Sequence, residues 1–97
     1  MVKLVWTDQS IADLRDIGDY IAQDSEQHAK FTVKKILERV NILKEFPQAG
    51  RIVPEKNEET IRELIEGSYR IIYEITPDNI ISILTIHHSS KELKHEK

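Results

Sequence analysis

Apolar residues in the first fifth of the chain follow a strand period and then a helical period. Residues 2–6, VKLVW, place Val2, Leu4 and Trp6 on one side of a short strand. The following segment, SIADLRDIGDYIAQ, carries apolar side chains every three or four positions, which predicts an amphipathic helix with Thr7 or Asp8 as its N-cap.

A second helical pattern follows after DSEQ, which is a start signal with Asp24 as cap and Gln27 reaching back. We expect this helix to run to about Phe46, where Pro47 cannot continue it. Its apolar stripe comprises Ala29, Val33, Ile36, Leu37, Val40 and Leu43. A short connection between two amphipathic helices predicts an antiparallel hairpin, in which Leu14, Ile36, Leu37 and Val40 are buried together.

The second half of the chain reads as strands. RIVPE is a short extended piece that Pro54 confines to an edge, and TIRELIEG fits a helix or a strand. We favour a strand for TIRELIEG because two β-rich segments, YRIIYEI and IISILTIHH, follow it directly. The expected fold is α+β in a single domain over residues 1–97: an N-terminal strand and an antiparallel helical hairpin packed on one face of a mostly antiparallel sheet of about four strands.

The turn TPDN sets the register of the last two strands. A three-residue loop over residues 77–79 places Thr76 opposite Ile80. In an unbroken ladder, Arg70 then lies opposite Ile86, and His88 is its diagonal neighbour on the same face, roughly 7–8 Å away. A phosphate could bridge two such side chains. The more apolar face, assigned to the helices, carries Tyr69, Ile71, Tyr73, Ile75, Ile81, Ile83, Thr85 and His87.

Composition narrows the class of protein. Apolar residues make up 39% and charged residues 32%, the balance of a soluble globular domain. There is no apolar run of ~18 residues, no signal-peptide pattern and no cysteine, so we expect a cytosolic protein without disulfides or membrane spans. The net charge of −3 speaks against an obvious nucleic-acid binder. Residues 25–46 are nevertheless locally basic, with Lys30/Lys34 and Lys35/Arg39 at helical spacing, although a solvated helix face with Lys34–Glu38 compensation is the favoured explanation.

Four segments carry a family resemblance, in the order IADLRDIGDYIAQDS, FPQAGRIVPE, IRELIEGSYRIIYEI and ILTIHHSSKEL. The chain resembles, from Val2 to Leu93, the RelE/ParE superfamily of toxins from bacterial type II toxin–antitoxin pairs, which serve growth arrest and plasmid stabilisation. The pattern FPxxGRxVPE…RE…YRIIY is similar to ParE-like members. The resemblance implies a cytoplasmic toxin without metal or cofactor, and a small antitoxin partner that is partly disordered when free. Exposed apolar area on the helical hairpin or the first strand would receive it, and Phe31 and Ile42 are candidates because they fall off the main stripe.

The superfamily divides by target. ParE-like members inhibit DNA gyrase, whereas RelE- and YoeB-like members cut messenger RNA on the ribosome. A third possibility is an inactive homologue that acts only as an antitoxin-binding partner. Residues 51–66 carry three positive and five negative side chains, which disfavours RNA and favours the gyrase reading. In that reading, a sheet edge or the tail from Ser89 to Lys97 would carry the contact.

If the protein is a nuclease, the resemblance assigns three catalytic residues. Glu55 corresponds to the general base, Arg70 to the cation that holds the phosphate, and His88 to the acid that protonates the leaving oxygen. Each also has a structural alternative. Arg70 can pair with Glu63 or Glu74, His88 can bond the backbone at a strand end, and Glu55 can be a solvated turn residue.

Overall fold

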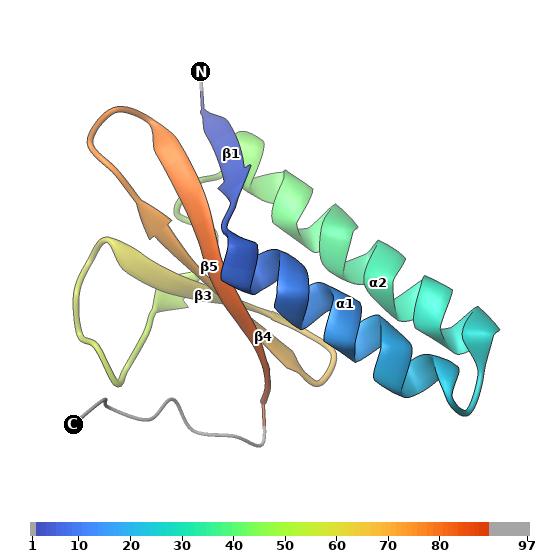
Figure 1. Cartoon of the computed structure of the whole chain (residues 1–97). Helices are drawn as coiled ribbons and strands as arrows, with labels where there is room; N and C mark the ends of the chain where they lie inside the picture. Colours follow the sequence, from blue (N-terminus) through green and yellow to red (C-terminus); the bar gives the residue numbers. More distant parts are fainter. Residues whose placement is uncertain (1, 90–97) are drawn as a thin grey trace.

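A computed structural model describes residues 2–89 of the chain. Two helices and five strands follow one another along the sequence (Figure 1). They are β1 (Lys3–Trp6), α1 (Asp8–Ala22), α2 (Glu26–Asn41), the short 3-10 helix η1 (Ile42–Lys44), β2 (Arg51–Ile52), β3 (Ile61–Glu66), β4 (Tyr69–Ile75) and β5 (Ile80–His88). No helix in this part of the chain is both long and apolar enough to cross a membrane.

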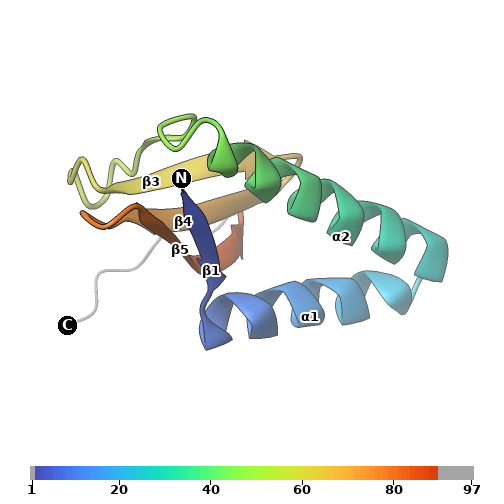
Figure 2. The ribbon, with the colours of Figure 1, turned by 90° about the horizontal axis from the view of Figure 1, so that it is seen from above.

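The strands form one sheet in the order β1-β5-β4-β3-β2. β1 runs parallel to β5, and all other neighbours are antiparallel. The helical hairpin covers one face, and its far end projects beyond the sheet (Figure 2). The predicted α+β architecture is therefore confirmed, with five strands because both short outer strands, β1 and β2, join the sheet.

The helix boundaries follow from their caps. Thr7 caps α1 as predicted, since its Oγ1 accepts a hydrogen bond of 3.1 Å from the Ser10 amide. The same hydroxyl lies 2.8 Å from the Ile83 carbonyl oxygen and donates to it, which ties the start of the helix to β5. The cap of α2 is Ser25 instead of Asp24, because the Ser25 hydroxyl accepts from the His28 amide at 3.0 Å.

Core packing confirms most of the predicted apolar stripe. The buried cluster comprises Ile36, Val40, Leu43, Leu64, Ile71, Tyr73, Ile81, Ile83 and Ile86, with Leu14 partly buried against it. Leu37 does not belong to it, since 45% of its surface is exposed, and the prediction that it is buried with Ile36 was wrong. Consecutive helical residues are about 100° apart around the axis, so the stripe that faces the sheet includes Ile36 and leaves Leu37 at its margin.

A β-bulge in the β4–β5 pair makes the observed register differ from the predicted one. Close to the turn the prediction holds: Asn79 adopts φ 63°, and Ile75 pairs with Ile81. Tyr73 still pairs with Ile83, but Ile72 pairs with Thr85, so the bulge inserts Leu84 as an extra residue.

Beyond the bulge every predicted partner shifts by one position. Arg70 lies opposite His87 instead of Ile86, and Tyr69 lies opposite His88. Residues that pair directly share a face, and faces alternate along a strand. His88 therefore lies on the helix side with Tyr69, whereas Arg70 and His87 lie on the other side. The prediction that Arg70 and His88 share a face was wrong, and Ile86 takes the core position expected for Thr85 or His87.

Candidate functional site

Arg70 is surrounded by carboxylates on the sheet face away from the helices. Its Nε donates to Glu63 Oε1 at 2.7 Å, while its two terminal nitrogens donate to Glu55 at 3.0 and 2.9 Å. The contact with Glu55 is bidentate, the strongest geometry for this kind of pair. Every nitrogen of the Arg70 guanidinium thus already donates to a carboxylate.

The cluster is largely buried and electrically balanced. Glu63 is 1% exposed and Arg70 7% exposed. Arg51, on β2, donates from its Nε to the second Glu63 oxygen and keeps 66% of its own side chain exposed. Two arginines and two glutamates join β2, β3, β4 and the turn that contains Glu55 into one network, here called the carboxylate cluster.

The protonation state of Arg70 follows from these partners. The hydrogen bonds that Arg70 donates to Glu55, and then to Glu63, raise the pKa of Arg70 above its ordinary value and outweigh the opposing effect of burial. Arg70 is therefore a permanent cation, and the adjacent carboxylates of Glu55 and Glu63 compensate its charge. Of its predicted ion-pair partners, the structure selects Glu63, and it adds Glu55.

His88 lies apart from the carboxylate cluster. Its ring meets the Tyr69 ring edge-on, with centroids 5.5 Å apart and planes at 80°. Because both rings lie on the helix side of the sheet, His88 and Arg70 are separated by the sheet itself. Of the three residues singled out in the sequence, Glu55 and Arg70 come together and His88 does not join them.

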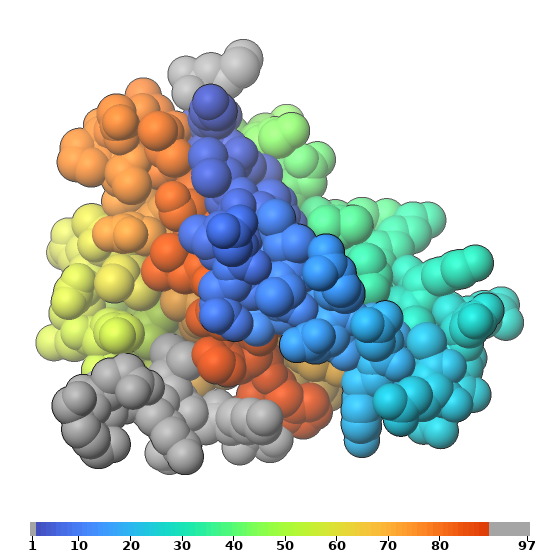
Figure 3. All heavy atoms as spheres, in the orientation of Figure 1, coloured from blue at the N-terminus to red at the C-terminus, as the bar shows by residue number. Residues whose placement is uncertain are grey.

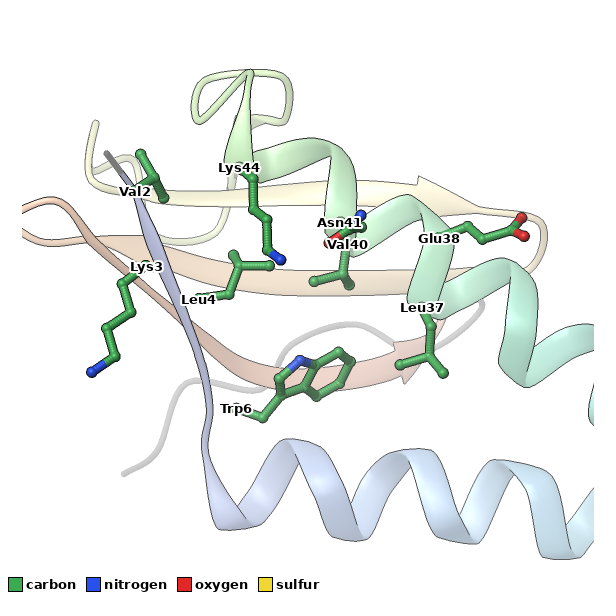
Figure 4. Close-up of a pocket in the computed structure, with 9 residues that line it drawn as sticks. All are labelled: Val2, Lys3, Leu4, Trp6, Leu37, Glu38, Val40, Asn41 and Lys44. Atoms are coloured by element: carbon green, nitrogen blue, oxygen red, sulfur yellow. The ribbon is translucent and has the colours of Figure 1, made fainter.

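A groove between β1 and α2 forms a wide hollow on the described surface. Its volume is about 820 Å³, and it is lined by Val2, Lys3, Leu4, Trp6, Leu37, Glu38, Val40, Asn41 and Lys44. Val2, Leu4 and Trp6 point toward α2, as their alternation predicts, and Lys3 points away (Figure 4). We call this hollow the β1–α2 groove. Its wall contains Leu37, which the sequence pattern had placed in the core.

Among the described residues, no strand pairs with the outer edge of β1, which is the last strand of the sheet on that side. In the space-filling view, β1 and α1 lie at the front of the molecule (Figure 3). An open strand edge beside an apolar groove offers both backbone hydrogen-bonding groups and side-chain pockets to a partner chain.

Comparison with known proteins decides the family. Residues 4–93 match the family described as the ParE toxin of the type II toxin-antitoxin system, parDE. The chain belongs to the ParE toxin family. It is therefore the toxin of a type II toxin–antitoxin system, and an antitoxin is its implied partner.

Individual relatives of this ParE-family chain agree. It is 31% identical over 91 residues to Toxin RelE2 of Caulobacter vibrioides, covering 94% of this chain and 99% of that protein. It is 34% identical over 92 residues to the putative toxin Y4kP of Sinorhizobium fredii, covering 93% and 91% of the two chains. A solved structure titled "Chromosomal ParDE TA system from P. aeruginosa" superimposes with a TM-score of 0.75 at 27% identity, covering 91% of this chain and 96% of that one. Each match covers at least 91% of both chains, so the similarity extends over the whole domain and is not confined to one motif.

Proposed function

We propose that this toxin arrests growth in the cytoplasm by binding and inhibiting DNA gyrase, with no bond-making chemistry of its own. The observation that carries this proposal is the full engagement of Arg70 by Glu55 and Glu63. Membership of the ParE family points in the same direction.

RNA cleavage would require Arg70 to stabilise a phosphate in the transition state. A phosphate can reach the guanidinium only by displacing a bidentate carboxylate and approaching the buried charge of Glu63. The negative charges of the phosphate and of the Glu63 carboxylate would repel each other strongly, because the site is partly buried. Glu55 would likewise have to release two hydrogen bonds before it could act as a base, and His88 lies across the sheet from both. The carboxylate cluster supports a structural clamp in place of a nuclease centre.

A supercoiling assay with purified gyrase tests the proposal. The purified toxin should inhibit supercoiling of relaxed plasmid by gyrase, and toxin premixed with its antitoxin should not. A parallel reaction should contain ribosomes translating a defined message, with primer extension to detect cuts. If the toxin left gyrase supercoiling unchanged and new cuts appeared in the message, gyrase inhibition would be rejected and endoribonuclease activity supported. Neither effect, with antitoxin binding intact, would identify an inactive partner protein.

We also propose that the antitoxin binds in the β1–α2 groove. Leu37 is large, apolar and almost half exposed there, Lys44 and one acid, Glu38, line the groove, and Lys3 points outward from the same strand of its wall. This surface fits an antitoxin segment with apolar anchors and acidic flanks, which can also extend the sheet along the open edge of β1. The toxin variant Leu37→Glu should lose co-purification with the antitoxin while keeping its melting temperature. Ile11→Glu is the matched control, because Ile11 on α1 is exposed to a similar extent, 43%. Equal loss in both variants would remove the groove from consideration.

A further inference from the structure

A second hollow lies on the helix side of the molecule, between the first half of α2 and the turn that joins β3 to β4. Its volume is about 330 Å³. Its walls include His28, Phe31 and Lys35 from α2, and Glu66, Ser68, Tyr69 and His88 from the opposite side. We call it the α2–turn pocket. It shares no lining residue with the β1–α2 groove and lies across the sheet from the carboxylate cluster.

The α2 wall of this pocket is an exposed aromatic and cationic arrangement. Phe31 is 57% exposed, and the His28 ring stacks near it with centroids 6.5 Å apart and planes 18° from parallel. Lys35 Nζ lies 5.8 Å from the centroid of the Phe31 ring. Within residues 2–89, Lys35 makes no salt bridge with a carboxylate, although Glu66 lines the opposite wall of the pocket.

Charge is divided unevenly between the two helices. α1 carries Asp8, Asp13, Asp16 and Asp19 against Arg15, whereas α2 carries Lys30, Lys34, Lys35 and Arg39 against Glu26 and Glu38. The basic stripe noted in the sequence thus lies on the helix that forms the aromatic wall of the pocket. A positive local field on α2 coexists with the overall charge of −3.

We propose that the α2–turn pocket binds one unstacked nucleotide of a single-stranded DNA segment. The base stacks on Phe31 beside His28, the adjacent phosphate faces Lys35, and the stripe on α2 receives the neighbouring phosphates. Stacking on an exposed ring together with lysine contacts to the backbone is the usual way in which proteins hold single strands. An acidic peptide could satisfy the lysines, but it would make no use of the open ring pair. The inference rests on the proposed function, because a gyrase bound to its DNA presents nucleotides to a docked inhibitor.

Fluorescence anisotropy of a fluorescein-labelled 12-nucleotide single strand tests this contact without gyrase. The full-length toxin should bind it in about 25 mM salt, a concentration at which phosphate contacts are strong. Phe31→Leu should weaken binding by roughly five- to hundredfold, since it removes a stacking surface. Lys35→Gln should weaken binding and lower the slope of log K against log salt by about 0.7. Phe46→Leu is the control for the aromatic change, because Phe46 is 60% exposed outside the pocket, and Arg15→Gln is the control for charge.

The inference would be overturned if the toxin did not bind the oligonucleotide in about 25 mM salt, or if Lys35→Gln and Arg15→Gln weakened binding equally. It would also be overturned if Phe31→Leu had no effect and a Glu-rich peptide competed for the toxin as well as the oligonucleotide does. The last result would identify a protein-binding surface. Melting temperatures of all variants should match the parent protein, since the changed side chains are exposed. Loss of oligonucleotide binding with retained gyrase inhibition would reject only this contact, and binding without gyrase inhibition would reject only the proposed target.

Discussion

The Tyr73 hydroxyl accepts a hydrogen bond of 2.9 Å from the backbone amide of Gly50, deep inside the protein. The same hydroxyl donates to the Pro47 carbonyl oxygen at 2.8 Å. One buried phenol on β4 therefore fixes both ends of the FPQAG loop, which leads from the helices into the sheet.

Gly50→Ala should destabilise the protein by about 1–3 kcal/mol or more, because a Cβ there would lie 2.4 Å from the Glu63 carbonyl oxygen and 2.8 Å from the Tyr73 hydroxyl. Urea denaturation followed by circular dichroism measures the loss. Gly67→Ala does not serve as a steric control, since Gly67 has φ 58°, but Ala49→Ser, next to Gly50 and exposed, does. Unchanged stability of Gly50→Ala would mean that the loop is not packed against Tyr73.

Tyr73→Phe should change the dependence of stability on pH. Burial raises the pKa of Tyr73 above its usual value of 10.0. The stabilisation from this neutral phenol is therefore fully present below about pH 10 and is lost as pH rises toward the folded-state pKa, at about 1.4 kcal/mol per pH unit. Denaturation curves from pH 8 to 11 should show a steeper decline for the parent protein than for Tyr73→Phe. Identical slopes would place the phenol in contact with water.

Arg70→Ala should cost about 3–5 kcal/mol, because it leaves the buried Glu63 charge without its buried arginine partner. Arg51→Ala is the matched control on the same carboxylate and should cost about 1 kcal/mol or less, since Arg51 is mostly exposed. Urea denaturation of both variants at neutral pH would measure these two losses of stability. Equal costs would indicate that Glu63 is open to solvent.

His88→Ala and Glu55→Gln test the nuclease alternative in cells. If the toxin acts by inhibiting gyrase, both variants should retain toxicity. Any loss of toxicity in Arg70→Ala should then be explained by its lower melting temperature. Induction of each gene without antitoxin, with colony counts beside melting temperatures, separates the cases. Loss of toxicity in both His88→Ala and Glu55→Gln, with melting temperatures unchanged, would favour catalysis.

Ile36→Ala and Leu37→Ala should behave very differently although the residues are adjacent. Ile36 is fully buried, so its truncation should cost about 2–5 kcal/mol, whereas Leu37→Ala should cost less than about 1 kcal/mol. Thermal or urea denaturation of the two variants gives the comparison. A large loss for Leu37→Ala would contradict its place on the groove wall.

Period and capping signals were sufficient to predict most of the fold. Alternation in VKLVW, two helical stripes and the TPDN turn correctly predicted β1, the hairpin and the link from β4 to β5. The position of the α2 cap was wrong by one residue, since Asp24 and Ser25 are both good caps and only the backbone geometry selects between them.

The arrangement around the candidate residues could not be predicted from alternation alone. Leu84 occupies the bulge between two regular stretches, and nothing in the run IISILTIHH marks it as the extra residue. One inserted residue reverses the face of everything beyond it, which moved His88 away from Arg70. Glu63 was a predicted partner of Arg70, but the bidentate contact with Glu55 depends on how the turn after β2 folds over the sheet.

The parallel pairing of the first strand with the last has a consequence for synthesis of the toxin. The Thr7 hydroxyl at the end of β1 bonds to the Ile83 carbonyl, 76 residues further along the chain. A growing polypeptide cannot seat its first strand until β5 has left the ribosome, and a prematurely terminated chain lacks an interior strand of the sheet. The toxin sheet can therefore be completed only after β5 has been translated, so the pairing of its first strand comes late in folding.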